Sequence, residues 1–131
     1  MRPIAPFSPP LQKMSECLRR IIGSYDSLMV DQDSATKMVG MAAIGWNLAQ
    51  FPVEEREAQF QKISKQLLGR VKKEHEEDMR KIVWEFLARK ERLYSHDQRW
   101  VAGFNVVVSL NGISLEVAAA VPPKDDDSPA R

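Results

Sequence analysis

Residues 101–121 read VAGFNVVVSLNGISLEVAAAV, and this stretch decides the fold of the last part of the chain. The dipeptide Asn111-Gly112 is typical of a two-residue type I′ turn, in which both central residues need a positive φ. Apolar residues recur at every second position before and after it, which is the period of a β-strand. The stretch therefore predicts an antiparallel β-hairpin with strands at about 99–110 and 113–121 and a turn at 111–112.

The predicted turn also determines which residues face each other across the hairpin. On one face every opposed residue is apolar, so we expect this face to pack on helices. The opposed pairs are Leu110–Ile113, Val108–Leu115, Val106–Val117 and Phe104–Ala119. A two-stranded hairpin on its own is only marginally stable in water, so it needs this support.

The second face of the predicted hairpin carries little charge, and a hairpin has two free edges. Both features are typical of a surface that contacts another protein. We therefore expect the hairpin to pair with a protein partner or with a second copy of the chain, giving a homodimer. The residues predicted for this contact are Val101, Asn105, Val107, Ser109, Ser114 and Glu116.

Four helices are predicted before the hairpin, at about 9–28, 34–50, 52–68 and 71–94. In the first, apolar residues from Leu11 to Leu28 recur at spacings of three and four, which is the stripe of an amphipathic helix. The second has Asp33 or Ser34 as its cap and is apolar nearly all round, which predicts the centre of a bundle. Its small residues, such as Gly45, should let neighbouring helices come close. The expected fold class is α+β and mainly α: a four-helix bundle-like domain with a C-terminal antiparallel β-hairpin.

The length and composition predict a single domain. The chain has 131 residues, of which 44% are hydrophobic, enough for a core of its own. We expect this domain to span residues 9–121, after a flexible proline-rich arm at 1–8 and before a disordered acidic tail at 122–131. Cys17 is the only cysteine of the 131 residues, which suits a cytoplasmic location. The longest apolar stretch, 38–51, is too short to cross a membrane.

Few side chains offer chemistry. His75 and Asp78 are weak candidates for metal ligands, since they stand three residues apart on one helix face. No second pair of this kind occurs on another helix, so we expect no metal site. His96 and Asp97 follow the last helix, but no serine or cysteine has a recognisable nucleophile context, so a polar loop is predicted there. The sequence carries no motif that indicates a cofactor.

Basic residues gather between positions 62 and 73, but acidic residues balance them in the surrounding helices. The net charge of the whole chain is +1, so a nucleic-acid partner is disfavoured. The sequence therefore favours a small non-catalytic interaction, regulatory or accessory protein over an enzyme. Two alternatives remain open at this point: a helical enzyme or binding protein for a small ligand or metal, and a helical nucleic-acid-binding protein.

Overall fold

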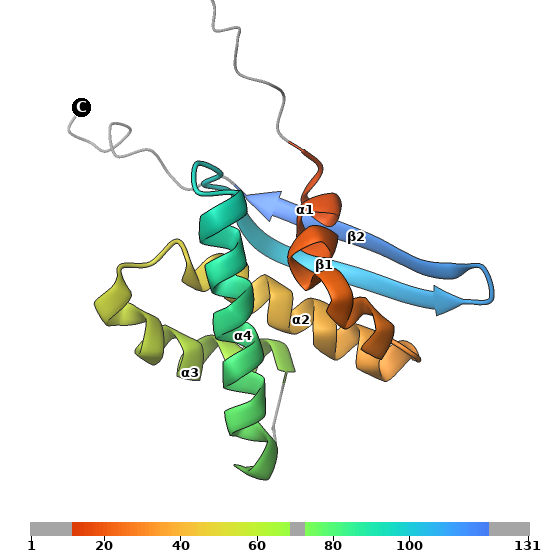
Figure 1. Cartoon of the computed structure of the whole chain (residues 1–131), viewed down its shortest axis with the longest axis horizontal. Helices are drawn as coiled ribbons and strands as arrows, with labels where there is room; N and C mark the ends of the chain where they lie inside the picture. The colour runs from red at the N-terminus through yellow and green to blue at the C-terminus, as the bar shows by residue number, and fades with distance from the viewer. Residues whose placement is uncertain (1–11, 69–72, 121–131) are drawn as a thin grey trace, which may run out of the picture.

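The computed structural model describes residues 12–68 and 73–120, and in this part of the chain four α-helices precede a two-stranded antiparallel sheet (Figure 1). The helices are α1 (Met14–Ile22), α2 (Gln32–Leu48), α3 (Arg56–Leu68) and α4 (Lys73–Leu93), with short 3₁₀ helices η1 (Gly23–Leu28) and η2 (Val53–Glu55). The strands are β1 (Trp100–Ser109) and β2 (Gly112–Ala120). The predicted α+β, mainly α fold is confirmed. The predicted arm at 1–8 and tail at 122–131 lie outside the described residues.

Helix α1 is shorter than the apolar stripe predicted. It ends at Ile22 because Gly23 adopts a φ of +55°, a left-handed conformation that glycine tolerates. Arg89 of α4 stabilises this end by donating hydrogen bonds to the carbonyls of Ile21 (2.6 Å) and Ile22 (3.1 Å). The chain continues as η1, and Leu28, predicted to lie on the buried stripe, is exposed.

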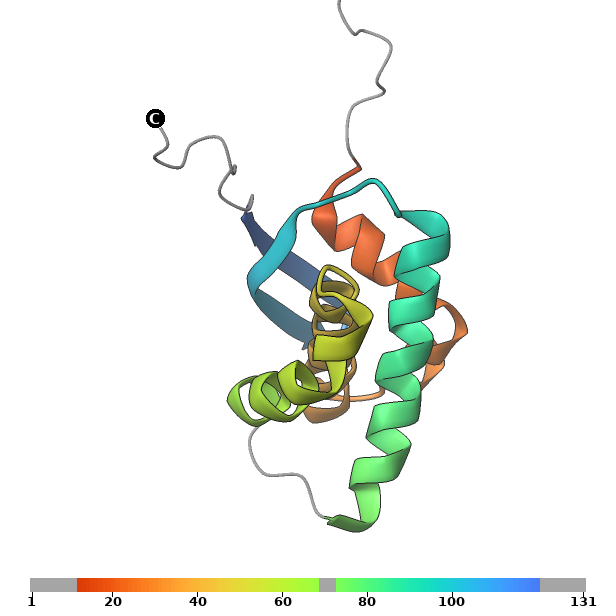
Figure 2. The ribbon, with the colours of Figure 1, turned by 90° about the vertical axis from the view of Figure 1, so that its left-hand side faces the viewer.

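Helix α2 is the centre of the fold, as predicted. It lies between the hairpin and α4 (Figure 2), and its side chains Ile44, Trp46 and Leu48 are fully buried. Its cap is neither of the two residues predicted. The carboxylate of Asp31 accepts a hydrogen bond from the backbone N–H of Ser34, and the Ser34 hydroxyl accepts one from the N–H of Asp31. This capping box places the helix cap two or three residues earlier than the sequence indicated.

Helices α2 and α4 are in close contact at Gly45. A Cβ atom placed on Gly45 would lie 2.9 Å from the carbonyl oxygen of Val83, 2.9 Å from the Cβ of Phe86 and 3.1 Å from the N of Leu87. Real Cβ atoms essentially never approach other atoms at the shorter of these distances. Glycine at this position therefore sets the spacing of the two helices, as the small residues of the predicted central helix indicated.

Helix α3 is attached to α4 by an aromatic and charged cluster. The rings of Phe60 and Trp84 meet edge to face at 5.3 Å, and the guanidinium of Arg80 stacks over both rings at 5.1 and 5.2 Å. The same guanidinium is paired with the carboxylate of Glu57 on α3. Arg80 thus links the two helices through its ring contacts and its charge together.

The contact between Glu57 and Arg80 makes the stability of the fold depend on pH. Hydrogen bonds from Arg80 lower the pKa of Glu57 from 4.5 to about 2. Because the folded-state pKa is the lower one, the contact stabilises the fold above about pH 4.5, and this contribution is lost as the pH falls through 2. More than half of the Glu57 side chain is exposed, so screening keeps the effect below about 1 kcal/mol.

We expect Glu57→Gln to lower the free energy of unfolding near pH 6 and to make a smaller difference near pH 2.5, because the unfolded wild type is then protonated at this position. Urea unfolding at the two pH values measures this. Glu54→Gln is the control, since Glu54 is exposed and pairs with no cation in the described part of the chain. An equal loss at both pH values would contradict the prediction.

The hairpin turns one residue earlier than predicted, so most residues of β1 pair with a residue two positions away from the predicted one. Ser109 pairs with Gly112, so the central turn residues are Leu110 and Asn111 instead of 111–112. Neither of these two has a positive φ, which rules out the predicted type I′ turn, whereas Gly112 has a φ of +118°. The correct pairs include Val108–Ile113, Val106–Leu115 and Phe104–Val117. Since side chains alternate with period two, this shift of two keeps the same residues on each face.

A bulge near the start of β1 corrects the prediction for Val101. The pairing skips Ala102, because Val101 stands opposite Ala119 and Gly103 opposite Ala118. One extra residue reverses the alternation of side chains beyond it. Val101, predicted to lie on the outer contact face, therefore points into the core and is buried.

Candidate functional site: the two edges of the hairpin

The outer edge of β1 is closed by side-chain amides of α2. The Gln32 amide donates to the carbonyl of Val106 (2.6 Å) and accepts from the N–H of Val108 (3.0 Å). Near the start of β1, the Asn47 amide donates to the carbonyl of Val101 (3.0 Å) and accepts from its N–H (2.8 Å). These amides occupy the positions that a third strand would take, so β1 cannot accept another strand there.

The outer edge of β2 lies on the side of the hairpin away from α2 (Figure 1). In an antiparallel pair, residues opposite each other both turn their backbone groups outward or both turn them inward. Because Val106, opposite Leu115, bonds outward to Gln32, the backbone groups of Leu115 also point outward, and so do those of Val117 and Ala119 at alternate positions. Within residues 12–68 and 73–120, nothing bonds to these three residues on that edge.

Arg19 of α1 sets the limit of this open edge. Its guanidinium donates to the carbonyl of Ile113 at 2.5 Å, the next outward-facing position along β2. We define the open edge of β2 as the outward backbone groups of Leu115, Val117 and Ala119. This edge begins after Ile113, whose carbonyl is already bonded to Arg19. The side chains of Leu115 and Val117 lie on the face of the sheet that the helices cover, and that of Ala119 lies at the margin of this face.

The outer face of the sheet carries five of the six residues predicted for contact. All five are exposed, and Val107 keeps 47% of its surface accessible. These residues are Asn105, Val107, Ser109, Ser114 and Glu116. Their position on one solvent-facing surface agrees with the alternation predicted, and their role in binding stays a prediction.

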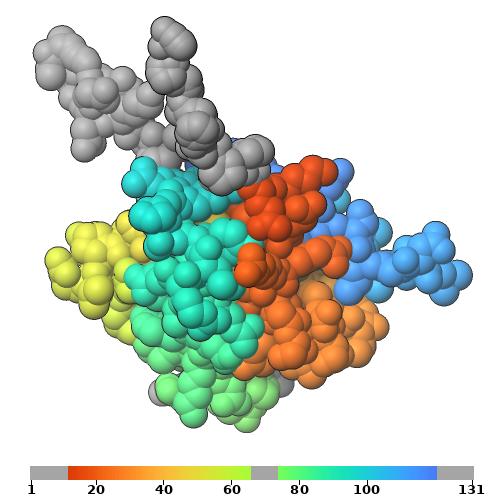
Figure 3. All heavy atoms as spheres, turned by 45° about the horizontal axis from the view of Figure 1, so that its top comes forward, coloured from red at the N-terminus to blue at the C-terminus, as the bar shows by residue number. Residues whose placement is uncertain are grey.

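The turn end of the hairpin projects beyond the helices (Figure 3). Leu110, at the first central position of the turn, is fully exposed. Among the described residues it is the most exposed of the large apolar side chains. The projecting end leaves the neighbouring part of the sheet accessible from solvent.

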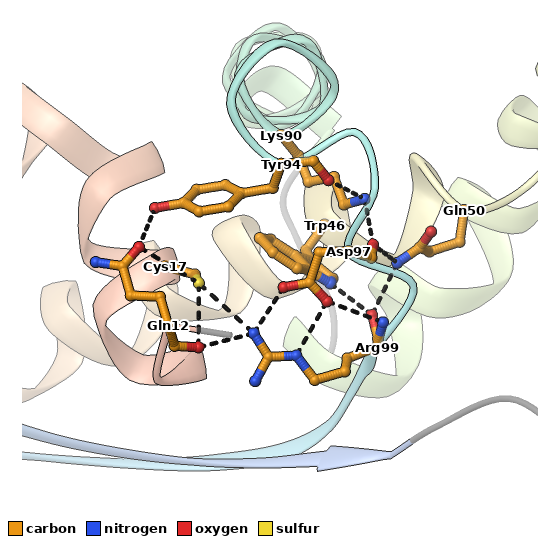
Figure 4. A network of polar contacts seen from close by, with 8 residues as sticks. All are labelled: Gln12, Cys17, Trp46, Gln50, Lys90, Tyr94, Asp97 and Arg99. Atoms are coloured by element: carbon orange, nitrogen blue, oxygen red, sulfur yellow. Dashed lines mark hydrogen bonds and ion pairs between the residues drawn. The ribbon is translucent and has the colours of Figure 1, made fainter. Parts of the chain in front are cut away.

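The start of β1 is anchored by a polar network that the sequence did not reveal (Figure 4). Between α4 and β1 the chain runs through a partly buried loop, and buried carbonyl groups need donors. Trp46 Nε1 donates to the carbonyl of Arg99 at 2.7 Å, and the Gln50 amide donates to the carbonyls of Arg99 (2.8 Å) and Asp97 (3.1 Å). Trp46 lies in the last turn of α2, and Gln50 lies in the turn that follows this helix.

An ion pair stands at the centre of this network. Arg99 Nη2 lies 2.6 Å from Asp97 Oδ2, and the side chain of Asp97 is only 5% exposed. Burial alone would raise the pKa of Asp97, but the hydrogen bonds from Arg99 outweigh it and hold that pKa below its ordinary value. Arg99 also donates to the carbonyl of Gln12 at 2.8 Å, which connects the segment before α1 to the start of the hairpin.

Cys17 lies against this pair, with its Sγ 3.8 Å from Arg99 Nη2. The thiol is fully buried, and burial raises its pKa despite the opposing effect of the Arg99 charge. A raised pKa keeps the sulfur in the thiol form, which reacts slowly. Cys17 is therefore a packing residue.

Lys90 closes the C-terminal end of α4. It is only 2% exposed, and its Nζ donates to the carbonyls of Tyr94 (2.9 Å) and Asp97 (2.7 Å). The ammonium also lies 5.0 Å from the ring centroid of Trp46, and burial lowers its pKa. Both carbonyls lie just beyond the last residue of α4, so this lysine supplies a donor to the backbone of the loop that follows the helix.

The remaining candidates from the sequence do not converge. His75 and Asp78 are both exposed, and no group of three or more His, Cys, Asp or Glu that could hold a metal ion occurs in the described part of the chain. His96 is exposed, whereas the neighbouring Asp97 pairs with Arg99. No helix within the described residues is long and apolar enough to cross a membrane.

Three residues that define the edges of the hairpin were missed from the sequence: Arg19, Gln32 and Asn47. Asn47 offered a signal, because it is a polar residue within a helix that is otherwise apolar nearly all round. An amide side chain on the buried side of such a helix must find hydrogen-bond partners in the backbone or in other side chains. No protein-family model, curated protein or solved structure matches this chain, so its own residues carry the functional argument.

Proposed function

We propose that this chain is a non-catalytic interaction or accessory protein that binds a β-strand of a protein partner along the open edge of β2. The observation that carries the proposal is the contrast between the two edges: Gln32 and Asn47 close β1, whereas the outward groups of β2 have no partner among the described residues. In this binding mode, main-chain hydrogen bonds supply affinity and alternate side chains supply specificity.

The composition of β2 supports this proposal. Sheet edges that do not bind partners usually carry lysines, prolines, bulges or inward-pointing charges, which prevent unwanted pairing. Along Ile113–Ala120 the only charge is that of Glu116, whose side chain lies on the solvent-exposed face of the sheet. The one bulge of the sheet lies on β1. An unprotected edge promotes aggregation, so the presence of such an edge on β2 favours a binding role.

The exposed outer face would supply the specificity. Val107 offers an apolar contact, while Asn105, Ser109, Ser114 and Glu116 offer hydrogen-bonding groups around it. A strand docked on β2 would extend this face, so its own side chains would lie beside Ser114 and Glu116. We also propose a cytoplasmic location, because a single buried thiol suits a reducing compartment, and cell fractionation would check it.

A photo-crosslinking amino acid at Ser114 should capture the partner in cells that normally make the protein. We expect an adduct from position 114 and none from Lys81, an exposed control position on α4. Val117→Pro should abolish the adduct because proline removes an outward N–H, whereas Val117→Ala should retain it. An adduct that survives Val117→Pro, or none at all, would contradict the proposal.

A further inference from the structure

We propose that the strand bound by β2 is the β2 strand of a second copy of this chain, paired antiparallel about a two-fold axis at Val117. The inference rests on the proposed function of the open edge and names its partner. It is carried by the even spacing of the open groups: Leu115 and Ala119 lie two residues on either side of Val117. An antiparallel pair centred there matches each open position with another open position.

Arg19 excludes a register centred on Leu115. Such a register would require the carbonyl of Ile113 to bond to the partner strand, but Arg19 already holds that carbonyl at 2.5 Å. A register centred on Glu116 meets a different obstacle. It would place the two Glu116 carboxylates directly opposite each other at the close spacing of a non-hydrogen-bonded pair, where like charges repel.

A register centred on Val117 avoids both obstacles. It opposes Leu115 with Ala119 of the partner subunit, and Glu116 with Ala118 of the partner subunit, so no like charges meet. Each opposed pair of open residues can exchange two backbone hydrogen bonds, which gives about six for the three pairs. The apolar side chains of Leu115 and Val117 would extend the face that the helices cover, and the exposed face would become continuous across both copies.

The closed edge of β1 explains why such pairing would stop at two copies. Joining two chains through β2 gives a four-stranded sheet whose outermost strands are both β1. Gln32 and Asn47 close the outer edges of those strands in each copy. One open and one closed edge per chain therefore produce a closed two-fold dimer and not a growing fibre.

Charges at position 118 test this register, because Ala118 is exposed and faces Glu116 of the partner subunit only in this arrangement. We expect the full-length chain to be a dimer by sedimentation equilibrium. Ala118→Glu should weaken the dimer by about threefold to tenfold, because two like-charged pairs form, and Ala118→Lys should tighten it by a similar factor. The charge swap Glu116→Lys with Ala118→Glu should reverse the weakening and tighten the dimer about as much as Ala118→Lys does, because it again forms two pairs of opposite charge. Thermal unfolding monitors the fold of each variant.

The outcomes separate this inference from the proposed function. A register centred on Ala118 would place the two copies of position 118 opposite each other, so both Ala118→Glu and Ala118→Lys would bring like charges together. Weakening of the dimer by both variants would therefore overturn the Val117 register. A dimer indifferent to all the variants would overturn pairing through β2. A monomer at every concentration up to about 100 µM would overturn self-pairing, while a crosslinked adduct with a different protein at Ser114 would still support the proposed function.

Discussion

Replacing Gly45 with alanine is expected to lower the free energy of unfolding by about 2–4 kcal/mol, because the added methyl group collides with α4. The nearest atoms are the carbonyl oxygen of Val83 and the Cβ of Phe86, each 2.9 Å from the new Cβ. Neither atom can rotate away, since both are fixed by the helix backbone. In a helix without this contact the same substitution would stabilise the protein by about 1 kcal/mol, so the two effects differ in sign.

Gly103→Ala is the matched control for this substitution. A Cβ at Gly103 meets no atom within 4 Å, and its φ is not in the left-handed region. We therefore expect no loss of stability, or a gain of about 0.5 kcal/mol, for the control. Urea unfolding measured on both variants compares the two directly. A Gly45→Ala protein as stable as the wild type would show that α2 and α4 are not packed as closely as described.

The central position of α2 could be predicted from the sequence, whereas the end of α1 could not. Nearly continuous apolar character indicated that α2 is central, and its glycines indicated close neighbours. The apolar stripe running on to Leu28 suggested a longer first helix. It ended at Gly23 instead, because the left-handed glycine and the carbonyl contacts of Arg89 are properties of the tertiary structure.

The hairpin shows which part of a strand pattern is robust. Alternation assigned its faces correctly over most of its length, because any shift of two residues leaves those faces unchanged. The turn type failed, since Asn-Gly also suits a turn in which only Gly112 takes a positive φ. The bulge at Ala102 gave no signal in the alternation, and it alone moved Val101 into the core.

The buried network at the start of β1 could not be seen in the sequence because its charged members, Lys90, Asp97 and Arg99, are ordinary surface residue types. Lys90 belonged to a basic helix end, and Asp97 and Arg99 to a polar loop. Their burial follows from the positions of Trp46, near the end of α2, and Gln50, in the turn that follows this helix. Only the assembled fold brings those donors to the loop.

Asp97→Ala is expected to lower the free energy of unfolding by about 3 kcal/mol, because it leaves a charge without its partner. The Arg99 side chain is only 17% exposed, so water cannot fully replace the lost carboxylate. The backbone N–H of Arg99 also loses the acceptor that lies 3.1 Å away. Urea unfolding at neutral pH measures the loss. Asp33→Ala is the control: its ion pair with Lys37 is exposed, so we expect a change below about 0.5 kcal/mol.

A double-mutant cycle shows whether the loss comes from the ion pair itself. Arg99→Ala alone leaves Asp97 as a buried carboxylate without its partner, so it too should be strongly destabilising. Removing both side chains leaves no buried charge from the pair, so the double variant should lose less stability than the sum of the two single variants, by about 1–3 kcal/mol. Additive losses would mean that Asp97 and Arg99 stabilise the loop independently. The fall in the pKa of Asp97 on folding would then need another source than Arg99.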